Sequence, residues 1–340
     1  MVMSIKVDVV LDLAMGDCGK GKVSHDLLRR GGYTHSLRFN GGGNAGHTIF
    51  HHGKKFVTHQ VPAGVFWGLP SVIGPGCVVN ATKLFDEVDY LEANGVPVKG
   101  LIKVASNAHL ITYGHLNLDS LDVRVGTTKT GNGPCYTDKY ARVGQRVSDK
   151  AAFFELNGVK VIDMFEEFYT REDDVVILAE GAQGFYLDID WGDYPFVTSS
   201  HCGIGSVLLN GFTHKQIRKV YGVVKAYETY VGAKKFEPAG NPTFERIREV
   251  GQEYGATTGR PRQVNWLNFN NLVKAARMNS IDELIINKLD ILDQVQEWAF
   301  YEGEKLLKFT NSDQFSDCLK LGISEKYPCK ITFSRNPHAI

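Results

Sequence analysis

Residues 5–30 read IKVDVVLDLAMGDCGKGKVSHDLLRR, and this stretch decides the fold class. Its first part, residues 5–13, is a β-branched apolar run that predicts a buried strand. A glycine-rich turn follows at once, and residues 23–30 predict the beginning of a helix. A strand, a glycine-rich loop and a helix in direct succession are typical of a phosphate-binding unit in α/β proteins.

The loop at residues 16–22, GDCGKGK, has the G-x-x-x-x-G-K spacing of a P-loop. Its glycines let backbone N–H groups face phosphate oxygens, while two lysines and the helix start add positive charge. Val23 stands where a P-loop has Ser or Thr, so another group must supply the usual Mg²⁺ ligand, and Asp17 lies inside the loop. The alternative is a tight surface turn with exposed lysines.

Further apolar runs are dispersed among helical patterns. We predict strands at residues 175–179, 219–224 and 283–286 and helices at residues 81–94, 269–278 and 312–319. This alternation predicts an α/β fold with a mostly parallel central sheet flanked by helices, a P-loop-like phosphate loop and elaborated active-site loops. Because no Pro/Ser-rich linker divides the sequence, we expect residues 1–340 to form a single domain.

The overall composition argues against several classes of protein. The 38 basic and 38 acidic side chains balance, which disfavours duplex nucleic acid or an anionic membrane as the main partner. Six cysteines without a C-x-x-C pair or a Cys/His cluster disfavour a disulfide scaffold and a zinc site. The sequence shows neither signal-peptide features nor a run of about 18 apolar residues, so we expect a cytoplasmic protein.

Residues 40–48, NGGGNAGHT, form a second glycine-rich loop that is hard to explain by packing alone. A lone histidine is most often a structural residue with its hydrogen bonds satisfied. His47, however, lies in a glycine-rich segment whose backbone can adapt to a ligand. A general acid, or a hydrogen-bond donor to a developing oxyanion, is a suitable role for it.

Four other loops carry polar residues suited to ligands. Thr127, Thr128 and Arg142 in residues 126–146 suit phosphate, although a surface loop before a charged helix is an equal alternative. Residues 180–190, EGAQGFYLDID, follow a predicted strand, where open α/β sheets bind ligands; an ordinary strand-to-helix connection is the alternative.

The remaining two loops suggest a dicarboxylate and a purine. Residues 255–262, GATTGRPR, offer arginines that bind carboxylates bidentately, against the alternative of a solvated basic loop. Residues 287–290, NKLD, follow a predicted strand and suggest guanine recognition, against the alternative of a charge pair at a helix start. Those residues and the phosphate loop also fit a P-loop-like GTPase or nucleotide-binding regulator, and a catalytically inactive binding protein is a third possibility.

Taken together, these loops resemble the adenylosuccinate synthetase family. The family signatures GDEGKGK, NAGHT, GTTxRGxGPxYxDKxxR, EGAQGxxLDIDxGxYPxVTSS, GATTGRxR and KLDxLD appear in the same order. In this chain they read GDCGKGK, NAGHT, GTTKTGNGPCYTDKYAR, EGAQGFYLDIDWGDYPFVTSS, GATTGRPR and NKLDILD, between Asp17 and Asp293. The resemblance implies a ligase that couples L-aspartate to C6 of a 6-oxopurine nucleoside monophosphate through a 6-phosphoryl intermediate, with hydrolysis of a nucleoside triphosphate.

The resemblance also assigns roles to residues. Asp17 would remove the purine N1 proton and bind Mg²⁺ together with the Gly46 carbonyl, and His47 would stabilise the 6-oxygen. The expected triphosphate site consists of Gly16, Cys18, Gly19, Lys20, Gly21, Lys22, Lys288, Asp290, Ser334 and Pro337. The monophosphate would be held by Asn44, Thr128, Gln183, Thr198 and, across a homodimer interface, Arg142. The aspartate substrate would be held by Thr257, Thr258, Arg260 and Arg262.

Several positions depart from the family pattern. Cys18 replaces the usual acid, His25 replaces a frequent Asp, and Gly43 stands where bacterial members have His. The C-terminal loop usually resembles STGP and here reads SRNP, at residues 334–337, so the phosphoryl donor is ATP, dATP or GTP.

The chain is also short, like the archaeal and phage branches of the family. One phage branch, the N6-succino-2-amino-2'-deoxyadenylate synthases, accepts deoxyguanylate and uses ATP, and the GDCGKGK loop resembles that branch. We therefore favour GMP or dGMP as substrate, with IMP and GTP-dependent adenylosuccinate formation as the alternative.

Overall fold

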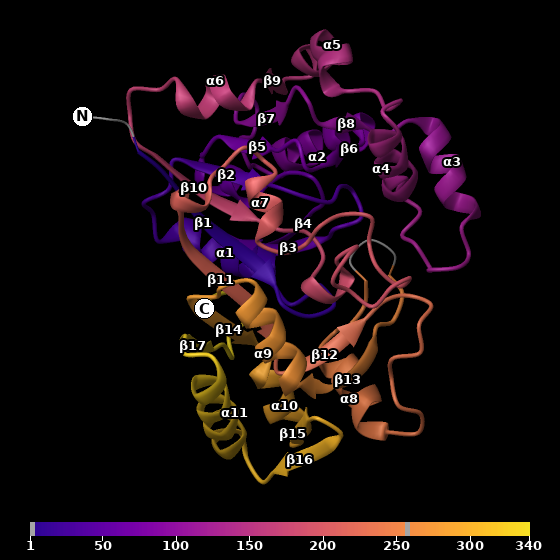
Figure 1. Ribbon diagram of the computed structural model, residues 1–340, viewed down its shortest axis with the longest axis vertical. Helices are drawn as coiled ribbons and strands as arrows, with labels where there is room; N and C mark the ends of the chain where they lie inside the picture. Colours follow the sequence, from indigo (N-terminus) through magenta and orange to yellow (C-terminus); the bar gives the residue numbers. More distant parts are fainter. Residues whose placement is uncertain (1–3, 256–258) are drawn as a thin grey trace.

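The computed structural model describes residues 4–255 and 259–340. Its centre is a nine-stranded sheet with the order β17-β14-β11-β1-β10-β2-β5-β7-β9 (Figure 1). Every strand pairing in that sheet is parallel. The strands are β1 (Ile5–Asp12), β2 (His35–Arg38), β5 (Ser71–Ile73), β7 (Ile102–Ala105), β9 (Lys160–Ile162), β10 (Val175–Glu180), β11 (Ile217–Lys225), β14 (Glu283–Asn287) and β17 (Lys330–Phe333).

The predicted α/β class and parallel sheet are therefore confirmed. Helices flank the sheet: α1 (Lys20–Arg29), α2 (Ala81–Ala93), α3 (Tyr113–Leu121), α4 (Asn132–Ala141), α5 (Ala151–Leu156), α6 (Met164–Tyr169), α7 (Gly205–Leu208), α8 (Pro242–Val250), α9 (Phe269–Met278), α10 (Leu289–Val295) and α11 (Ser312–Lys326). Two helix boundaries were predicted wrongly: α1 begins three residues before Val23, and α11 continues seven residues past Leu319.

Smaller, separate sheets accompany the central one. A four-stranded sheet has the order β12-β13-β15-β16, and two further pairs are β3-β4 and β6-β8. Their strands are β3 (His47–His51), β4 (Lys54–Thr58), β6 (Val78–Val79), β8 (His109–Leu110), β12 (Tyr227–Tyr230), β13 (Gln263–Asn268), β15 (Trp298–Glu302) and β16 (Lys305–Phe309). One apolar cluster includes buried residues of the central sheet, such as Val9, and of the four-stranded sheet, such as Phe300. Among the described residues, no helix has the length and apolar character needed to cross a bilayer.

The carboxyl edge of the central sheet positions the candidate site. The phosphate loop follows β1, while Arg38, Glu180 and Asn287 are the last residues of β2, β10 and β14. Since all these strands run parallel, their carboxyl ends meet at one edge of the sheet, the usual place for ligands in open α/β folds. Sequence segments that lie far apart in the chain therefore converge there.

Candidate active site

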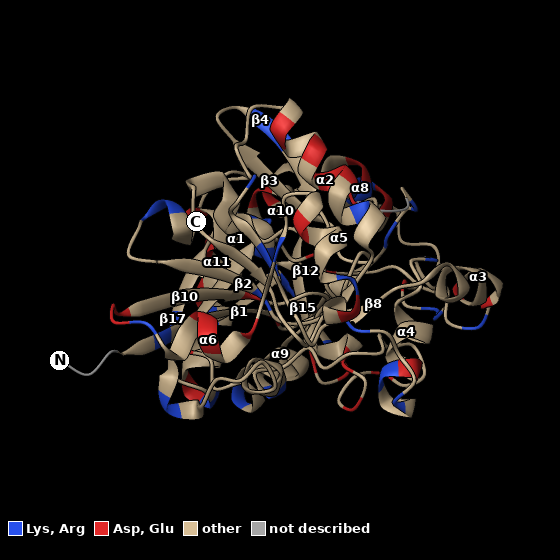
Figure 2. Ribbon diagram, turned by 90° about the horizontal axis from the view of Figure 1, so that it is seen from above, with Lys and Arg blue, Asp and Glu red and all other residues tan. Residues whose placement is uncertain are grey.

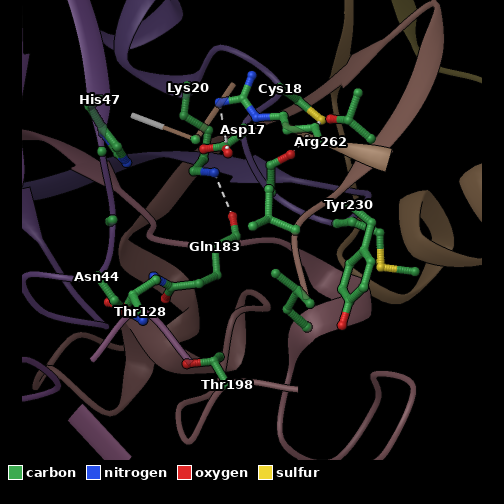
Figure 3. Close-up of a pocket in the computed structure, with 18 of the residues that line it drawn as sticks. Asp17, Cys18, Lys20, Asn44, His47, Thr128, Gln183, Thr198, Tyr230 and Arg262 are labelled. Carbon is green, nitrogen blue, oxygen red and sulfur yellow. Dashed lines mark hydrogen bonds and ion pairs between the residues drawn. The ribbon is translucent and has the colours of Figure 1, made fainter. Parts of the chain in front are cut away.

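A single cavity of about 1340 Å³ lies at this edge of the sheet. Most of the predicted site residues contribute to its lining, and Figure 3 shows several of them pointing into it. The predicted residues in the lining are Gly16, Asp17, Cys18, Gly19, Lys20, Gly21, Lys22, Asn44, Gly46, His47, Thr128, Gln183, Thr198, Arg262, Lys288, Asp290 and Pro337. Loops that are up to 321 residues apart in sequence (from Gly16 to Pro337) thus share one space.

Asp12, the last residue of β1, fixes the backbone of the phosphate loop through its carboxylate. The Asp12 carboxylate accepts hydrogen bonds from the backbone N–H groups of Ala14, Gly16 and Cys18, at 2.9, 3.2 and 3.0 Å. Lys20 donates to Asp12 Oδ2 at 3.2 Å and also to the Gln183 carbonyl. Lys20 is buried, and through these two hydrogen bonds it stabilises the loop as well as lining the cavity.

Gly19 precedes α1 in a left-handed conformation, with φ of 94°. A Cβ there would lie 2.9 Å from the Asn287 side-chain nitrogen, which donates to the Cys18 carbonyl at 2.8 Å. Asn287, the first residue of the NKLD motif, therefore supports the phosphate loop, a contact that the guanine interpretation of that motif did not include.

We expect Gly19→Ala to lower the free energy of unfolding by more than the strain of a left-handed alanine alone would. Gly32 is the matched control, since its φ is 86° and a Cβ there would meet nothing within 4 Å. Both variants carry the left-handed strain, but only Gly19→Ala displaces Asn287, so its free energy of unfolding falls by about 1 kcal/mol more. Urea unfolding and triphosphate titration measure this, and equal losses in the two variants would contradict the contact.

His47 begins β3 and is held between two charged side chains. Its Nδ1 pairs with the Glu180 carboxylate, and Arg38 donates to its Nε2 at 2.9 Å. Burial, followed by the Arg38 charge, lowers the pKa of His47 to about 4, so the imidazole is neutral at pH 7. Burial opposes the ionisation of Glu180, but His47 and Arg38 outweigh it and lower the pKa of Glu180 to about 2.

This arrangement fixes the tautomer of the neutral His47. Nδ1 carries the proton that faces the Glu180 carboxylate, and Nε2 accepts from the Arg38 guanidinium. Arg38 is thus a second donor beside the predicted oxyanion donor, although the sequence analysis assigned it no role. The His47 side chain points into the cavity in Figure 3.

Asp17 lies in a left-handed conformation, with φ of 58°. Its Oδ2 lies 2.9 Å from Arg262 Nη2 (Figure 3). The other terminal nitrogen of Arg262 pairs with Glu253. Gln183 and Lys288 share the unusual positive φ, at 57° and 66°. With Gln252, at 51°, four non-glycine residues of positive φ line this cavity, and such a cluster is typical of a functional site.

Four predicted monophosphate ligands lie together on another wall. Asn44 accepts a hydrogen bond from Asn132 at 2.7 Å, and the hydroxyls of Thr128 and Thr130 are 2.9 Å apart. Gln183 and Thr198 line the same space. Arg142, by contrast, is exposed at the end of α4 and does not line this cavity.

The loop predicted to bind aspartate is described in part. Thr257 and Thr258 lie outside the described residues. Arg260 donates to the carbonyls of Gly126 and Thr127, at 3.1 and 3.3 Å, next to the predicted monophosphate ligand Thr128. Since Arg262 reaches Asp17, this loop connects the phosphate loop with the wall that carries Thr128.

The far end of the cavity carries the residues expected to face the triphosphate base. Lys22 donates to the Ser334 hydroxyl and the Asn336 carbonyl, both at 2.9 Å, and burial lowers its pKa to about 8. Ser334 is itself buried and outside the cavity lining, whereas Pro337 lies within it. Burial raises the pKa of Asp290, which shares this end of the cavity with Lys288.

The structure also offers one cluster of potential metal-binding side chains among its described residues, Asp188, Asp190 and His201. Asp188 already accepts hydrogen bonds from the backbone N–H groups of Asp190, Trp191 and Cys202, which explains its burial without an ion. The predicted Mg²⁺ ligands are elsewhere: the Asp17 carboxylate and Gly46 both border the main cavity, and oxygen donors of this kind suit Mg²⁺.

A parallel sheet with a phosphate loop, a buried Glu–His–Arg group and an acid–arginine pair in one cavity defines a nucleotide-dependent α/β enzyme. The family model of the adenylosuccinate synthetases matches residues 9–158 and 157–303. The chain therefore belongs to the adenylosuccinate synthetase family, as the motif order predicted, and it is a carbon–nitrogen ligase of that type.

Relatives and solved structures agree with this membership. Adenylosuccinate synthetase of Geobacillus kaustophilus (strain HTA426) is 36% identical over 358 residues, which cover 89% of this chain and 83% of the relative. The Streptococcus gordonii synthetase is 39% identical over 337 residues, which cover 84% of this chain and 77% of the relative. The fully ligated synthetase from Plasmodium falciparum superposes with a TM-score of 0.84 at 28% identity, covering 98% of each chain.

Cyanophage S-2L succinoaminodeoxyadenylate synthetase, solved with dGMP and dATP, superposes with a TM-score of 0.72. The match covers 94% of this chain and 99% of the phage chain, at 21% identity. At that identity the similarity establishes a shared fold.

Proposed function

We propose that this ligase joins L-aspartate to C6 of a 6-oxopurine nucleoside monophosphate whose 6-oxygen is first phosphorylated by a nucleoside triphosphate. The observation that carries the proposal is that Asp17, His47 and Arg262 border one cavity together with the phosphate loop. A base, an oxygen-facing donor and a carboxylate-binding arginine are the groups that this chemistry requires. An aspartate-independent GTPase would leave the last two groups without a role.

The proposed reaction has two steps. Asp17 takes the N1 proton of the purine, so that O6 becomes nucleophilic and attacks the γ-phosphorus, releasing the nucleoside diphosphate. The amine of aspartate, held by Arg260 and Arg262 with Thr257 and Thr258, then attacks C6. Inorganic phosphate departs with the former O6, and the amine loses a proton. Mg²⁺, held by Asp17 and the Gly46 carbonyl, would offset charge on the phosphates.

We favour a 2-amino substrate, GMP or dGMP, which gives N6-succino-2-amino-(deoxy)adenylate. Where the family usually has an acid, this chain has Cys18, whose side chain is buried against the Gly16 carbonyl. Burial, followed by the Asp12 charge, raises the pKa of the Cys18 thiol well above its usual value, so the loop presents a neutral group here. The phage neighbour bound to dGMP and dATP supports the same preference.

IMP, which would give adenylosuccinate, is the second candidate substrate. The curated bacterial relatives, all named adenylosuccinate synthetases, favour it. GMP and IMP share the 6-oxo group and N1–H, so Asp17 and His47 serve both. For the donor, we propose ATP or dATP rather than GTP, because SRNP replaces the usual STGP-like loop beside Lys288 and Asp290.

An assay of the purified protein with IMP, GMP and dGMP, each combined with ATP, dATP and GTP, separates these candidates. We expect succinylated product from GMP or dGMP with an adenine donor, and turnover that requires L-aspartate. Turnover of IMP alone would reject the 2-amino preference. Triphosphate hydrolysis that is independent of aspartate would instead favour the GTPase alternative.

We also propose that residues 1–340 act as one cytoplasmic domain that works as a homodimer. The segment around Arg142 is unusually apolar for a surface, since α3, α4 and their flanks expose Tyr113, Leu118, Leu121, Val123, Tyr140 and Val143. In Figure 2, α3 and α4 lie together at one side of the molecule. Burial of this surface by a second copy would stabilise the dimer and could bring Arg142 to the partner's monophosphate site.

We expect Arg142→Leu to raise the KM for the monophosphate about tenfold or more, because a charge-assisted phosphate contact is lost. Arg146→Leu, four residues on and also exposed, is the control. Mixing Arg142→Leu with Asp17→Asn subunits is expected to restore part of the activity, since one site of each mixed dimer has both residues. An absence of restoration in dimers shown to exchange subunits would argue against the shared site.

A further inference from the structure

Arg262 connects two carboxylates of the candidate site. One terminal nitrogen lies 2.9 Å from Asp17 Oδ2 (Figure 3). The other terminal nitrogen pairs with Glu253. The Arg262 side chain is 11% exposed and that of Asp17 is 34% exposed, so solvent screens this pair only in part. The pair places a unit positive charge directly on the proposed metal ligand.

Glu253 anchors the arginine independently of Asp17. Its carboxylate is fully buried and accepts hydrogen bonds from Lys225 Nζ at 2.7 Å and from the Tyr227 hydroxyl at 2.6 Å. Burial opposes its ionisation, but Lys225, Arg262 and Lys288 outweigh burial and lower the pKa of Glu253 to about 2. Glu253 therefore stays ionised at neutral pH and keeps Arg262 in place beside the phosphate loop.

A divalent cation on Asp17 would have to bind next to this guanidinium. The carboxylate would share its charge between Arg262 and the metal, and the two cations would repel each other across a few ångströms. Phosphates of a bound triphosphate would relieve that repulsion, because they add negative charge in the same space. Without nucleotide, Glu253 is the one described residue that offsets this repulsion, and its carboxylate also pairs with Lys225.

We propose that Arg262, positioned by Glu253, is the resident counter-ion of Asp17 and competes with the divalent cation in the nucleotide-free protein. Metal binding at Asp17 then follows or accompanies triphosphate binding instead of preceding it. This inference rests on the proposed function only in taking Asp17 as a metal ligand.

The test is a titration of the nucleotide-free protein with Mn²⁺, followed by electron paramagnetic resonance of the free ion. We expect Arg262→Gln to bind Mn²⁺ roughly tenfold or more tightly than the wild type, since a charged hydrogen bond to Asp17 is removed. Arg262→Lys keeps the charge and is expected to stay within about threefold of the wild type, so it separates a charge effect from structural damage. Arg171→Gln, which removes an equal charge from a side chain paired with Glu167 outside the cavity lining, is the control.

The double variant Asp17→Asn with Arg262→Gln locates the metal. Loss of the gain in Mn²⁺ affinity in that variant supports the proposal. Retention of the gain, or an Arg262→Gln affinity no higher than that of the wild type, overturns it. The titration contains no substrate, so it tests the inference even if the protein fails the ligase assay. If the protein is an active ligase but Arg262→Gln shows no gain in Mn²⁺ affinity, only the counter-ion role of Arg262 is rejected.

Discussion

Replacing Asp17 by Asn is expected to lower kcat by about 10²–10⁴-fold while the protein stays folded. The amide keeps the size of the side chain but cannot take the N1 proton of the purine. It also weakens the proposed Mg²⁺ site. Folding is expected to survive, because Asp17 is partly exposed and Arg262, its ion-pair partner among the described residues, keeps its contact with Glu253. Steady-state kinetics and a thermal unfolding curve on the same preparation measure both quantities.

Asp193→Asn is a suitable control for the loss of one carboxylate. Asp193 is 55% exposed, pairs with Lys234 and lies outside the lining of the main cavity. We expect this variant to keep the kcat of the wild type within about twofold. If Asp17→Asn kept a comparable rate, Asp17 would not be the base of the reaction.

The second large effect is expected at His47. His47→Gln is predicted to lower kcat by about 10²–10³-fold. The loss arises because His47, protonated beside Glu180 as charge develops on O6, would donate its Nε2–H to that oxygen. Glu180→Gln keeps His47 but removes the carboxylate that orients Nδ1, so a smaller loss of about tenfold or more is expected. The KM for the monophosphate is expected to change less than kcat in both variants, because the interaction strengthens as charge develops on O6.

The pH profile gives an independent check of His47. Its pKa of about 4 means that the imidazole is neutral in the free enzyme above about pH 5. An acidic limb of kcat/KM near pH 6.5 that disappears in His47→Gln would contradict the buried, neutral histidine. A wild-type rate in His47→Gln would remove His47 from the mechanism altogether.

The order of elements near the phosphate loop could be predicted from the sequence, because its signals are local. The β-branched run of β1 and the left-handed glycines Gly16 and Gly19 each act over a few residues. Ordered loop motifs then identified the family. The role of Asp12 also has a local signal, because a charged residue inside an apolar run is typical of a buried carboxylate with a specific partner.

Tertiary contacts account for what the sequence analysis missed. Arg38 meets His47, Glu253 meets Arg262, and Asn287 meets Cys18 across 269 residues, and no spacing rule predicts such pairs. The hairpin β15–β16 was missed although Gly303 marks its turn, because its short strands alternate weakly. The helix α11 was predicted too short, since its apolar face is narrow and only Phe315, Leu319 and Ile323 are buried.

The most direct test of the central claim follows the 6-oxygen itself. The substrate monophosphate is labelled with ¹⁸O at position 6 and incubated with the enzyme, triphosphate, Mg²⁺ and L-aspartate, and the products are analysed by mass spectrometry. A 6-phosphoryl intermediate displaced by aspartate predicts one ¹⁸O atom in each inorganic phosphate and a succinylated purine without label. Unlabelled phosphate, with the ¹⁸O still on the purine, would contradict the proposed reaction.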